Sequence, residues 1–182
     1  ASYDPNSECI VTVGVSEALD LAFRAILNPG DEVIYHEPCF VAYRPSIIMA
    51  GGTPAPIPTR SNNQFSVDPA DLEKAVSKKT KAILLNFPCN PTGALLDKDA
   101  MSKIAEIARN NNLFVVTDEI YSELTYEPGY TSIASLPGMK DRTIFLHGFS
   151  KAFSMTGFRI GYACGPADVI DGLVPYDAVS SL

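Results

Sequence analysis

TIFLHGFSKAFSMTGFRIGYACG, residues 143–165, holds two short apolar runs, 143–147 and 159–165, with only residues 148–158 between them. A parallel crossover between neighbouring strands needs about a dozen residues or more and usually contains a helix. The connection here is too short for that and contains two glycines. The second run is therefore expected to pair antiparallel within a sheet, and the connection to carry Lys151.

The rest of the chain alternates short apolar runs with longer segments in which apolar residues recur at helical spacing. Such alternation is typical of a mainly parallel sheet covered by helices on both faces. Together with the antiparallel run it predicts a three-layer α/β/α sandwich, with a mostly parallel sheet of about seven strands and one antiparallel strand. Pro45 predicts a kink or a late start in the second helical segment. The further strands are expected within residues 9–14, 31–35, 53–58, 81–87 and 113–119, and the helices within residues 15–28, 40–50, 69–78 and 98–112.

Composition restricts the classes of function. The chain has 182 residues, of which 46% are hydrophobic, enough for one domain with a buried core. Its net charge of −7 gives no general attraction for nucleic acid or for an anionic membrane. The four cysteines are far apart and form no CxxC pair, so they are interpreted as reduced thiols. Neither a signal peptide nor an apolar run that could span a bilayer is evident, so a cytoplasmic protein is expected.

Residues with distinctive chemistry follow four of the expected strands. In open parallel sheets, ligands bind beyond the carboxyl ends of the strands. One pocket is therefore expected to gather these residues. The strand ends lead to Gly14-Val15-Ser16, to Asn90, to Asp118 and Tyr121, and to Lys151.

Gly14-Val15-Ser16 lies where a strand leads into a helix, and the free N–H groups of such a junction can bind an anion. A plain N-cap serine explains the same residues. Neither GxxxxGK[ST] nor GxGxxG occurs in the sequence, so a phosphate group on a small cofactor fits better than a nucleotide. Arg159 is a candidate for the bidentate partner of that phosphate.

Asp118 ends a run that is expected to be buried on both faces, and buried carboxylates are rare unless paired. A protonated ring nitrogen is one such partner. A helix N-cap, or an ion pair with a lysine, accounts for Asp118 without a ligand. Tyr121 can point its phenol into the same space. His36 and His147 stand alone in the sequence and are interpreted as core groups, so no metal site is expected.

Lys151 lies between Ser150 and Ala152 among small residues. The simplest interpretation is an ordinary surface lysine. Alternatively, close backbone packing removes water from the ammonium and, with Arg159 nearby, favours an amine that can form a Schiff base. A Schiff-base lysine, a carboxylate for a ring nitrogen and a phosphate site together describe pyridoxal 5'-phosphate.

Four segments carry a family resemblance. GFSKAFSMTGFRIG (148–161) resembles the pyridoxal-phosphate attachment signature of the class I and II aminotransferases, which are fold-type I enzymes of the aspartate aminotransferase superfamily. NFPCNPTG (86–93) and TDEIY (117–121) resemble two further motifs of that family. GVSEALDLAFRAILNPGDEV (14–33) resembles its phosphate-binding helix. The resemblance runs through nearly the whole chain, in the family's motif order.

The resemblance implies a role for each site residue. Lys151 would carry the cofactor as a Schiff base, and Asp118 would bond the pyridine nitrogen. Asn90 and Tyr121 would bond the 3-oxygen of the ring, while Phe40 would stack on its face. The phosphate contacts that it implies are Gly14, Val15, Ser16, Ser150 and Arg159.

Two positions depart from the family's pattern. The family often has serine or threonine where this chain has Gly148, so one phosphate hydroxyl is expected to be missing. Many members stack a tyrosine or tryptophan where Phe40 stands, and phenylalanine keeps the π-face without the polar group. The resemblance also implies a cis peptide bond between Asn90 and Pro91.

The resemblance implies parts that the sequence does not contain. The family's substrate-carboxylate arginine comes from a C-terminal small domain, and an N-terminal arm helps to close the site. Neither can be located in residues 1–182, which end within a segment of amphipathic pattern. The chain is therefore expected to be the cofactor-binding large domain, a fragment of an enzyme that forms homodimers.

Three functions remain open from the sequence. The first is transfer of an amino group between an amino acid and a 2-oxo acid. The second is a carbon–sulfur lyase, or another enzyme that transforms amino acids on the same scaffold, because a fold does not fix a reaction. The third, for the chain as it stands, is binding of pyridoxal phosphate without turnover.

Overall fold

The computed structural model describes residues 1–126 and 130–180, without the side chains of residues 176–180. The described residues form one seven-stranded sheet with helices packed on it. The strands are β1 (Cys9–Thr12), β2 (Glu32–Glu37), β3 (Thr53–Pro58), β4 (Thr80–Asn86), β5 (Phe114–Asp118), β6 (Thr143–Gly148) and β7 (Gly161–Cys164). The helices are α1 (Val15–Ile26), α2 (Tyr43–Met49), α3 (Pro69–Ala75), α4 (Lys98–Asn110) and α5 (Ala167–Ser180).

The strand order is β1-β7-β6-β5-β4-β2-β3. Strands β2 to β6 pair in parallel, whereas β7 is antiparallel to both of its neighbours, β6 and β1. The antiparallel pairing predicted from the short connection after β6 is therefore confirmed. Gly148 at the end of β6 pairs with Gly161 at the start of β7, so the loop that carries Lys151 leaves and re-enters the sheet at one place.

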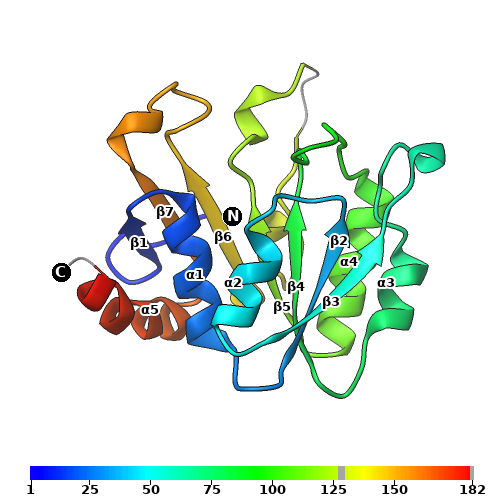
Figure 1. Ribbon diagram of the computed structural model, residues 1–182, viewed down its shortest axis with the longest axis horizontal. Helices are drawn as coiled ribbons and strands as arrows, with labels where there is room; N and C mark the ends of the chain where they lie inside the picture. The colour runs from blue at the N-terminus through cyan, green and yellow to red at the C-terminus, as the bar shows by residue number, and fades with distance from the viewer. Residues whose placement is uncertain (127–129, 181–182) are drawn as a thin grey trace.

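Helices cover both faces of the sheet, as predicted (Figure 1). On one face, α1, α2 and α5 pack with sheet residues such as Leu84 and Leu146 to form one apolar core. On the other face, α3 and α4 pack against residues such as Ile83 and Val115. Because side chains alternate along a strand, neighbouring residues of β4 serve the two cores. The predicted three-layer α/β/α sandwich is confirmed.

Proline explains two local features. Helix α2 begins only at Tyr43, with Pro45 in its first turn, so the predicted late start is confirmed. Pro54, Pro56 and Pro58 lie in β3, which is an edge strand and pairs only with β2. Proline has no backbone N–H to donate. An edge strand tolerates it where that N–H would have pointed away from the sheet, because no neighbouring strand is there to accept it.

The last helix, α5, buries Val169, Ile170 and Leu173 and exposes Asp168 and Asp171. Its first turns are therefore amphipathic, as the sequence predicts. The final two positions of that predicted segment, 181 and 182, lie outside the described residues. In the part of the chain that the structure describes, no helix is both long and apolar enough to cross a membrane.

Candidate functional site

A cavity of about 300 Å³ lies beyond the carboxyl ends of the central strands. Every residue that the sequence predicts for the site lines this cavity, with the exception of Gly14. Four further residues line it that the sequence did not single out. The lining residues are Val15, Ser16, Leu19, Phe40, Tyr43, Asn90, Asp118, Ile120, Tyr121, Ser150, Lys151, Thr156 and Arg159.

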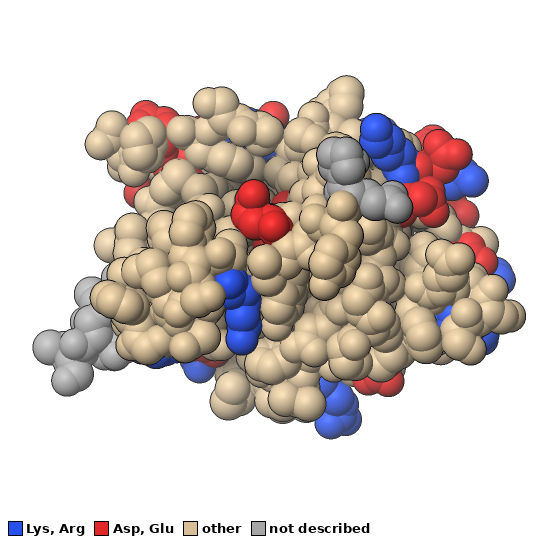
Figure 2. Space-filling view, turned by 90° about the horizontal axis from the view of Figure 1, so that it is seen from above, with Lys and Arg blue, Asp and Glu red and all other residues tan. Residues whose placement is uncertain are grey.

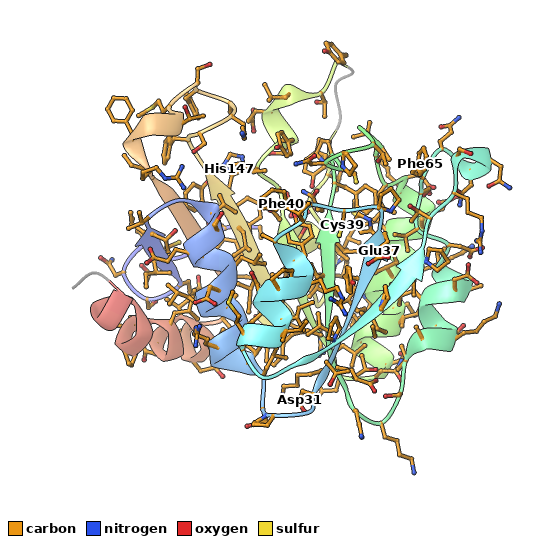
Figure 3. The ribbon with its side chains drawn as sticks, in the orientation of Figure 1. Asp31, Glu37, Cys39, Phe40, Phe65 and His147 are labelled. Carbon is orange, nitrogen blue, oxygen red and sulfur yellow. The ribbon has the colours of Figure 1, made fainter. Side chains whose placement is uncertain are left out.

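The figures show the setting of this cavity. Phe40 and His147 lie toward the side of the sheet edge where the carboxyl ends of β4, β5 and β6 meet, whereas Asp31 lies at the opposite ends of the strands (Figure 3). Figure 2 looks onto the edge with the carboxyl ends, and charged side chains are sparse over its centre. They gather instead at the end of the molecule formed by β3 and α3. The few charged groups in the cavity therefore dominate its local electrostatics.

The first charged feature is the start of α1. Gly14 is the N-cap residue and has no side chain with which to cap the first turn. Its φ of 81° lies in the left-handed region that favours glycine. Because Ser16 lies inside the helix, the interpretation of Ser16 as a plain N-cap is wrong. The uncapped N–H groups and the helix dipole make this end of α1 suitable for an anion.

Arg159 lies directly against that helix end. A Cβ atom added to Gly14 would be 2.5 Å from Arg159 Nη2, so the guanidinium would have to move aside for any larger residue. Arg159 itself has a left-handed backbone, with φ 54° and ψ 48°. Its Nη1 donates a hydrogen bond of 3.1 Å to the carbonyl oxygen of Thr156. A helix N-terminus and a guanidinium side by side can share one phosphate-sized anion.

The second charged feature is Asp118, at the end of β5 and only 6% exposed. Its Oδ2 accepts a hydrogen bond of 2.8 Å from the Tyr43 hydroxyl, and its Oδ1 accepts one of 3.2 Å from the backbone N–H of Ile120. Within residues 1–126 and 130–180, no lysine or arginine forms an ion pair with this carboxylate. Burial raises the pKa of Asp118 to about 6. A buried carboxylate that lacks a cationic partner and lines a cavity suits a ligand with a protonated nitrogen.

Tyr43 is a site residue that the sequence analysis missed. Burial and the Asp118 carboxylate raise the pKa of Tyr43, so its hydroxyl stays protonated and donates. Its ring also meets the edge of the Phe40 ring, with centroids 5.7 Å apart. Phe40 precedes α2, which begins at Tyr43, so no helical spacing in the sequence indicated that the two rings meet.

Asn86 is a second missed residue, and it joins β5 to the loop after β4. Its Nδ2 donates a hydrogen bond of 2.9 Å to the carbonyl oxygen of Asp118, and its Oδ1 accepts one of 3.0 Å from the backbone N–H of Asn90. Asn90 and the Tyr121 phenol both line the cavity, and burial raises the pKa of the phenol. The Asn90–Pro91 peptide bond is cis, as the resemblance implied. Asn86 thus positions Asn90 and Asp118 on the same cavity.

Lys151 lies in the loop between β6 and β7, and its side chain is exposed although it lines the cavity. The expectation that close packing removes water from this ammonium is therefore wrong. The close packing falls instead on Gly148, where an added Cβ would lie 3.0 Å from both Ile160 O and Val15 Cγ2. A serine or threonine at this position would need its neighbours to shift.

Both histidines are hydrogen-bonded within the fold. The backbone N–H of Asn86 donates to His36 Nε2 at 3.4 Å, and burial lowers the pKa of His36 to about 4. The backbone N–H of Gly148 donates to His147 Nδ1 at 2.7 Å, and His147 Nε2 lies 3.1 Å from the Ser122 hydroxyl. Among the described residues, no group of three or more His, Cys, Asp or Glu side chains could hold a metal ion.

The raised pKa of Asp118 predicts a pH-dependent stability of the chain without ligand. The folded-state pKa of about 6 exceeds the ordinary value of 3.8, so the folded chain binds the proton more tightly than the unfolded chain does. The resulting contribution to folding stability is complete below about pH 4 and is lost as the pH rises through about 6. The loss corresponds to about 3 kcal/mol. Asp118→Asn, which is neutral throughout, is therefore expected to raise the unfolding temperature at about pH 8 and to leave it nearly unchanged at about pH 4.

Thermal unfolding at the two pH values, monitored by circular dichroism, tests this expectation. Asp99→Asn is the matched control, because Asp99 is exposed in the first turn of α4. An equal shift at both pH values for Asp118→Asn would contradict a buried carboxylate that titrates in this range.

Comparison with known proteins places this geometry in context. The family model described as aminotransferase class I and II matches residues 1–178. YugH of Bacillus subtilis (strain 168), whose name assigns it provisionally as an aminotransferase, is 53% identical over 173 residues, covering 95% of this chain and 45% of that protein. The aspartate aminotransferase of Pyrococcus abyssi is 43% identical over 174 residues, with the same coverage of 95% and 45%. The chain thus spans about half the length of the curated relatives that it matches.

Solved structures agree with the fold. The aromatic aminotransferase from Pyrococcus horikoshii OT3 superposes with a TM-score of 0.96 at 39% identity, covering 99% of this chain and 48% of that chain. The aspartate aminotransferase from Thermus thermophilus with maleate superposes with a TM-score of 0.93 at 40% identity, covering 96% and 45%. The resemblance seen in the sequence motifs is confirmed.

Proposed function

The chain belongs to the class I and II aminotransferase family, and on that premise we propose that it is the pyridoxal-phosphate-binding large domain of an aminotransferase. The enzyme transfers an amino group between an amino acid and a 2-oxo acid. One observation carries the proposal: Lys151, the buried carboxylate of Asp118 and the guanidinium of Arg159 all line a single cavity.

The cavity fits each part of pyridoxal phosphate. The carboxylate of Asp118 has two hydrogen bonds but no cationic partner among the described residues, and a protonated pyridine nitrogen supplies one. The uncapped start of α1 and Arg159 offer positive potential for a phosphate. Lys151 offers an exposed primary amine on the same cavity. The donor set therefore suits an aromatic ring that carries a phosphate and a carbonyl carbon.

We assign the remaining contacts from the same lining. Asn90 and Tyr121 line the cavity and would hold the ring's 3-oxygen, and Phe40 would pack on the ring face. Gly14, Val15, Ser16, Ser150 and Arg159 would hold the phosphate.

The residues divide the chemistry between them. When bound, pyridoxal phosphate supplies a conjugated cationic ring that withdraws electrons from the substrate's Cα. Asp118 as a carboxylate keeps the proton on the ring nitrogen, and Tyr43, by donating to Asp118, favours the charged form of that carboxylate. Lys151 would supply the amine that attaches the cofactor, and as a free amine it would act as the general base that moves the Cα proton.

The names of relatives support amino-group transfer over a lyase reaction. Relatives at 40–44% identity are named for aspartate, for aromatic amino acids and for derivatives of diaminopimelate, and every one of these names is an aminotransferase. We therefore propose amino acids and 2-oxo acids as the substrates. We also propose that the enzyme is a homodimer, as the family resemblance implies, in which a partner subunit would cover exposed apolar side chains such as Val41 and Phe158.

Arg159→Ala is expected to weaken pyridoxal phosphate binding about 10- to 100-fold, because a charge-assisted hydrogen bond to the phosphate contributes roughly 1.5–3 kcal/mol. Pyridoxal, which lacks the phosphate, should lose little affinity. Titrations of both ligands, followed by visible absorbance, measure this difference. Arg109→Ala on α4 is the control, since Arg109 contacts the carbonyl of Pro137 instead of the cavity. Equal losses for the two ligands would make Arg159 a structural residue.

An amino-transfer assay tests the function itself. The protein is loaded with pyridoxal phosphate and one amino acid, and the keto product is measured before and after a 2-oxo acid is added. An aminotransferase gives one equivalent of keto product per site and continues only with the 2-oxo acid. Continuous release of ammonia and keto product without the 2-oxo acid would overturn the proposal in favour of a lyase.

A further inference from the structure

Strands β1 and β7 bring together two cysteines that are 155 positions apart in sequence. In the antiparallel register, Cys9 pairs directly with Cys164. Cα atoms of directly paired residues are about 4.5–5.5 Å apart in such a ladder. That spacing falls within the roughly 4.4–6.8 Å found across disulfide bonds. The two Sγ atoms are 2.8 Å apart, within about 1 Å of a disulfide bond length of about 2.05 Å.

We propose that Cys9 and Cys164 form a reversible disulfide by exchange with a small disulfide such as oxidised glutathione. Backbone geometry and the facing thiols need no rearrangement beyond a short approach of the two sulfur atoms. The inference goes beyond the proposed function, because it requires neither cofactor nor substrate.

The exchange takes place in two steps, and Cys9 reacts first because it is the more exposed of the two. Its thiolate attacks one sulfur of oxidised glutathione, which forms a mixed disulfide and releases one glutathione thiolate. Cys164, only 6% exposed, then gives up its proton, and its thiolate attacks the sulfur of Cys9. The second glutathione leaves, so two protein thiols are oxidised and one glutathione disulfide is reduced to two thiols. The two released glutathione thiolates take up the protons that the two cysteines lose.

The order of the two steps follows from the surroundings of the cysteines. Cys9 is partly exposed, whereas Cys164 is buried in the sheet. Burial and the neighbouring Cys9 raise the pKa of Cys164. Cys164 is therefore a poor first nucleophile for a reagent in solution, but it lies next to the sulfur that the first step activates.

The bond would fix a short edge strand of the sheet. β1 has four residues, lies at the sheet edge and pairs only with β7. The ladder ends at Thr12 and Gly161, two residues before Gly14. The bond would close a loop between two residues 155 positions apart, which removes much conformational freedom from the unfolded chain. Disulfide bonds that close long loops typically stabilise proteins appreciably. Oxidation is thus expected to hold β1 and the start of α1 in place.

The experiment exposes the dilute, ligand-free chain to oxidised glutathione and then maps peptides without reduction. We expect a cross-link between Cys9 and Cys164, loss of two of the four thiols, and full reversal by dithiothreitol. The unfolding temperature of the oxidised chain should exceed that of the reduced chain by about 10 °C. Cys9→Ser and Cys164→Ser should each abolish both effects, whereas Cys39→Ser should keep them.

Three results would overturn the proposal. Glutathione could remain on Cys9 as a stable mixed disulfide in the unaltered chain, or the cross-link could join Cys39 or Cys89 instead. A cross-link between Cys9 and Cys164 that leaves the unfolding temperature unchanged would refute the stabilising role. Should Cys164→Ser fail to fold, Cys9→Ser decides alone, since Cys9 lies at the more exposed position.

Discussion

Lys151→Ala should abolish covalent capture of pyridoxal phosphate. In the unaltered chain, borohydride reduces the carbon–nitrogen double bond between the cofactor and the lysine and leaves a permanent tag. Without the amine no such bond forms, and the label should fall to background. In the intact enzyme, loss of the general base should also lower the rate of amino transfer by roughly 10²–10⁴-fold.

The structure makes this variant a clean test. Lys151 is exposed and lies in a loop, so its truncation removes little packing and the unfolding temperature should be unchanged. Lys103→Ala, at an exposed position on α4, is the matched control and should retain full labelling. A label of normal intensity in Lys151→Ala would assign the attachment to another lysine.

Asp118→Asn should leave pyridoxal phosphate bound but slow the removal of the substrate's Cα proton by about 10²-fold or more. The amide keeps the shape of the side chain and can still accept a hydrogen bond from Tyr43. It carries no charge, however, and so cannot hold a proton on the pyridine nitrogen. Exchange of the Cα proton of an amino acid with deuterated water, measured in the intact enzyme, reports this step directly.

The same substitution has opposite expected effects on stability and on turnover. Without cofactor, removing the buried charge stabilises the fold at neutral pH, because burial disfavours the ionised carboxylate. With cofactor, the charge is the feature that the reaction needs. Asp99→Asn should leave Cα proton exchange unchanged and should lower the stability at neutral pH only slightly, through the lost interaction with the α4 dipole. Normal Cα proton exchange in Asp118→Asn would contradict the role of Asp118 at the ring nitrogen.

The layers of the fold could be predicted because the sequence pattern follows the physics of each element. β4 and β5 are buried on both faces and therefore appear as continuous apolar runs. The antiparallel direction of β7 followed from the length of one loop. The identity of the strands beside β7 could not be predicted, since nothing in the local sequence indicates that β1 lies at the sheet edge next to it. The pairing of Cys9 with Cys164 depends on that placement and could not be predicted from the sequence.

Some features of the candidate site could be predicted from the sequence, and others could not. Asp118, Asn90 and Lys151 could be located because they follow strands whose ends share one edge of the sheet. The bond between Tyr43 and Asp118 joins residues 75 positions apart, and only the packing of α2 against the sheet creates it. The exposure of Lys151 also escaped prediction, because small neighbours in sequence do not determine what covers a loop.

Titration of this chain with pyridoxal phosphate, followed by borohydride reduction and peptide mapping, tests the central claim most directly. We expect saturable binding at one site, a visible absorption band from the attached cofactor, and a tag found on Lys151. Inorganic phosphate should compete with this binding through Arg159 and the start of α1. Absence of the band, or a tag spread over several exposed lysines, would contradict a pyridoxal phosphate site in this cavity.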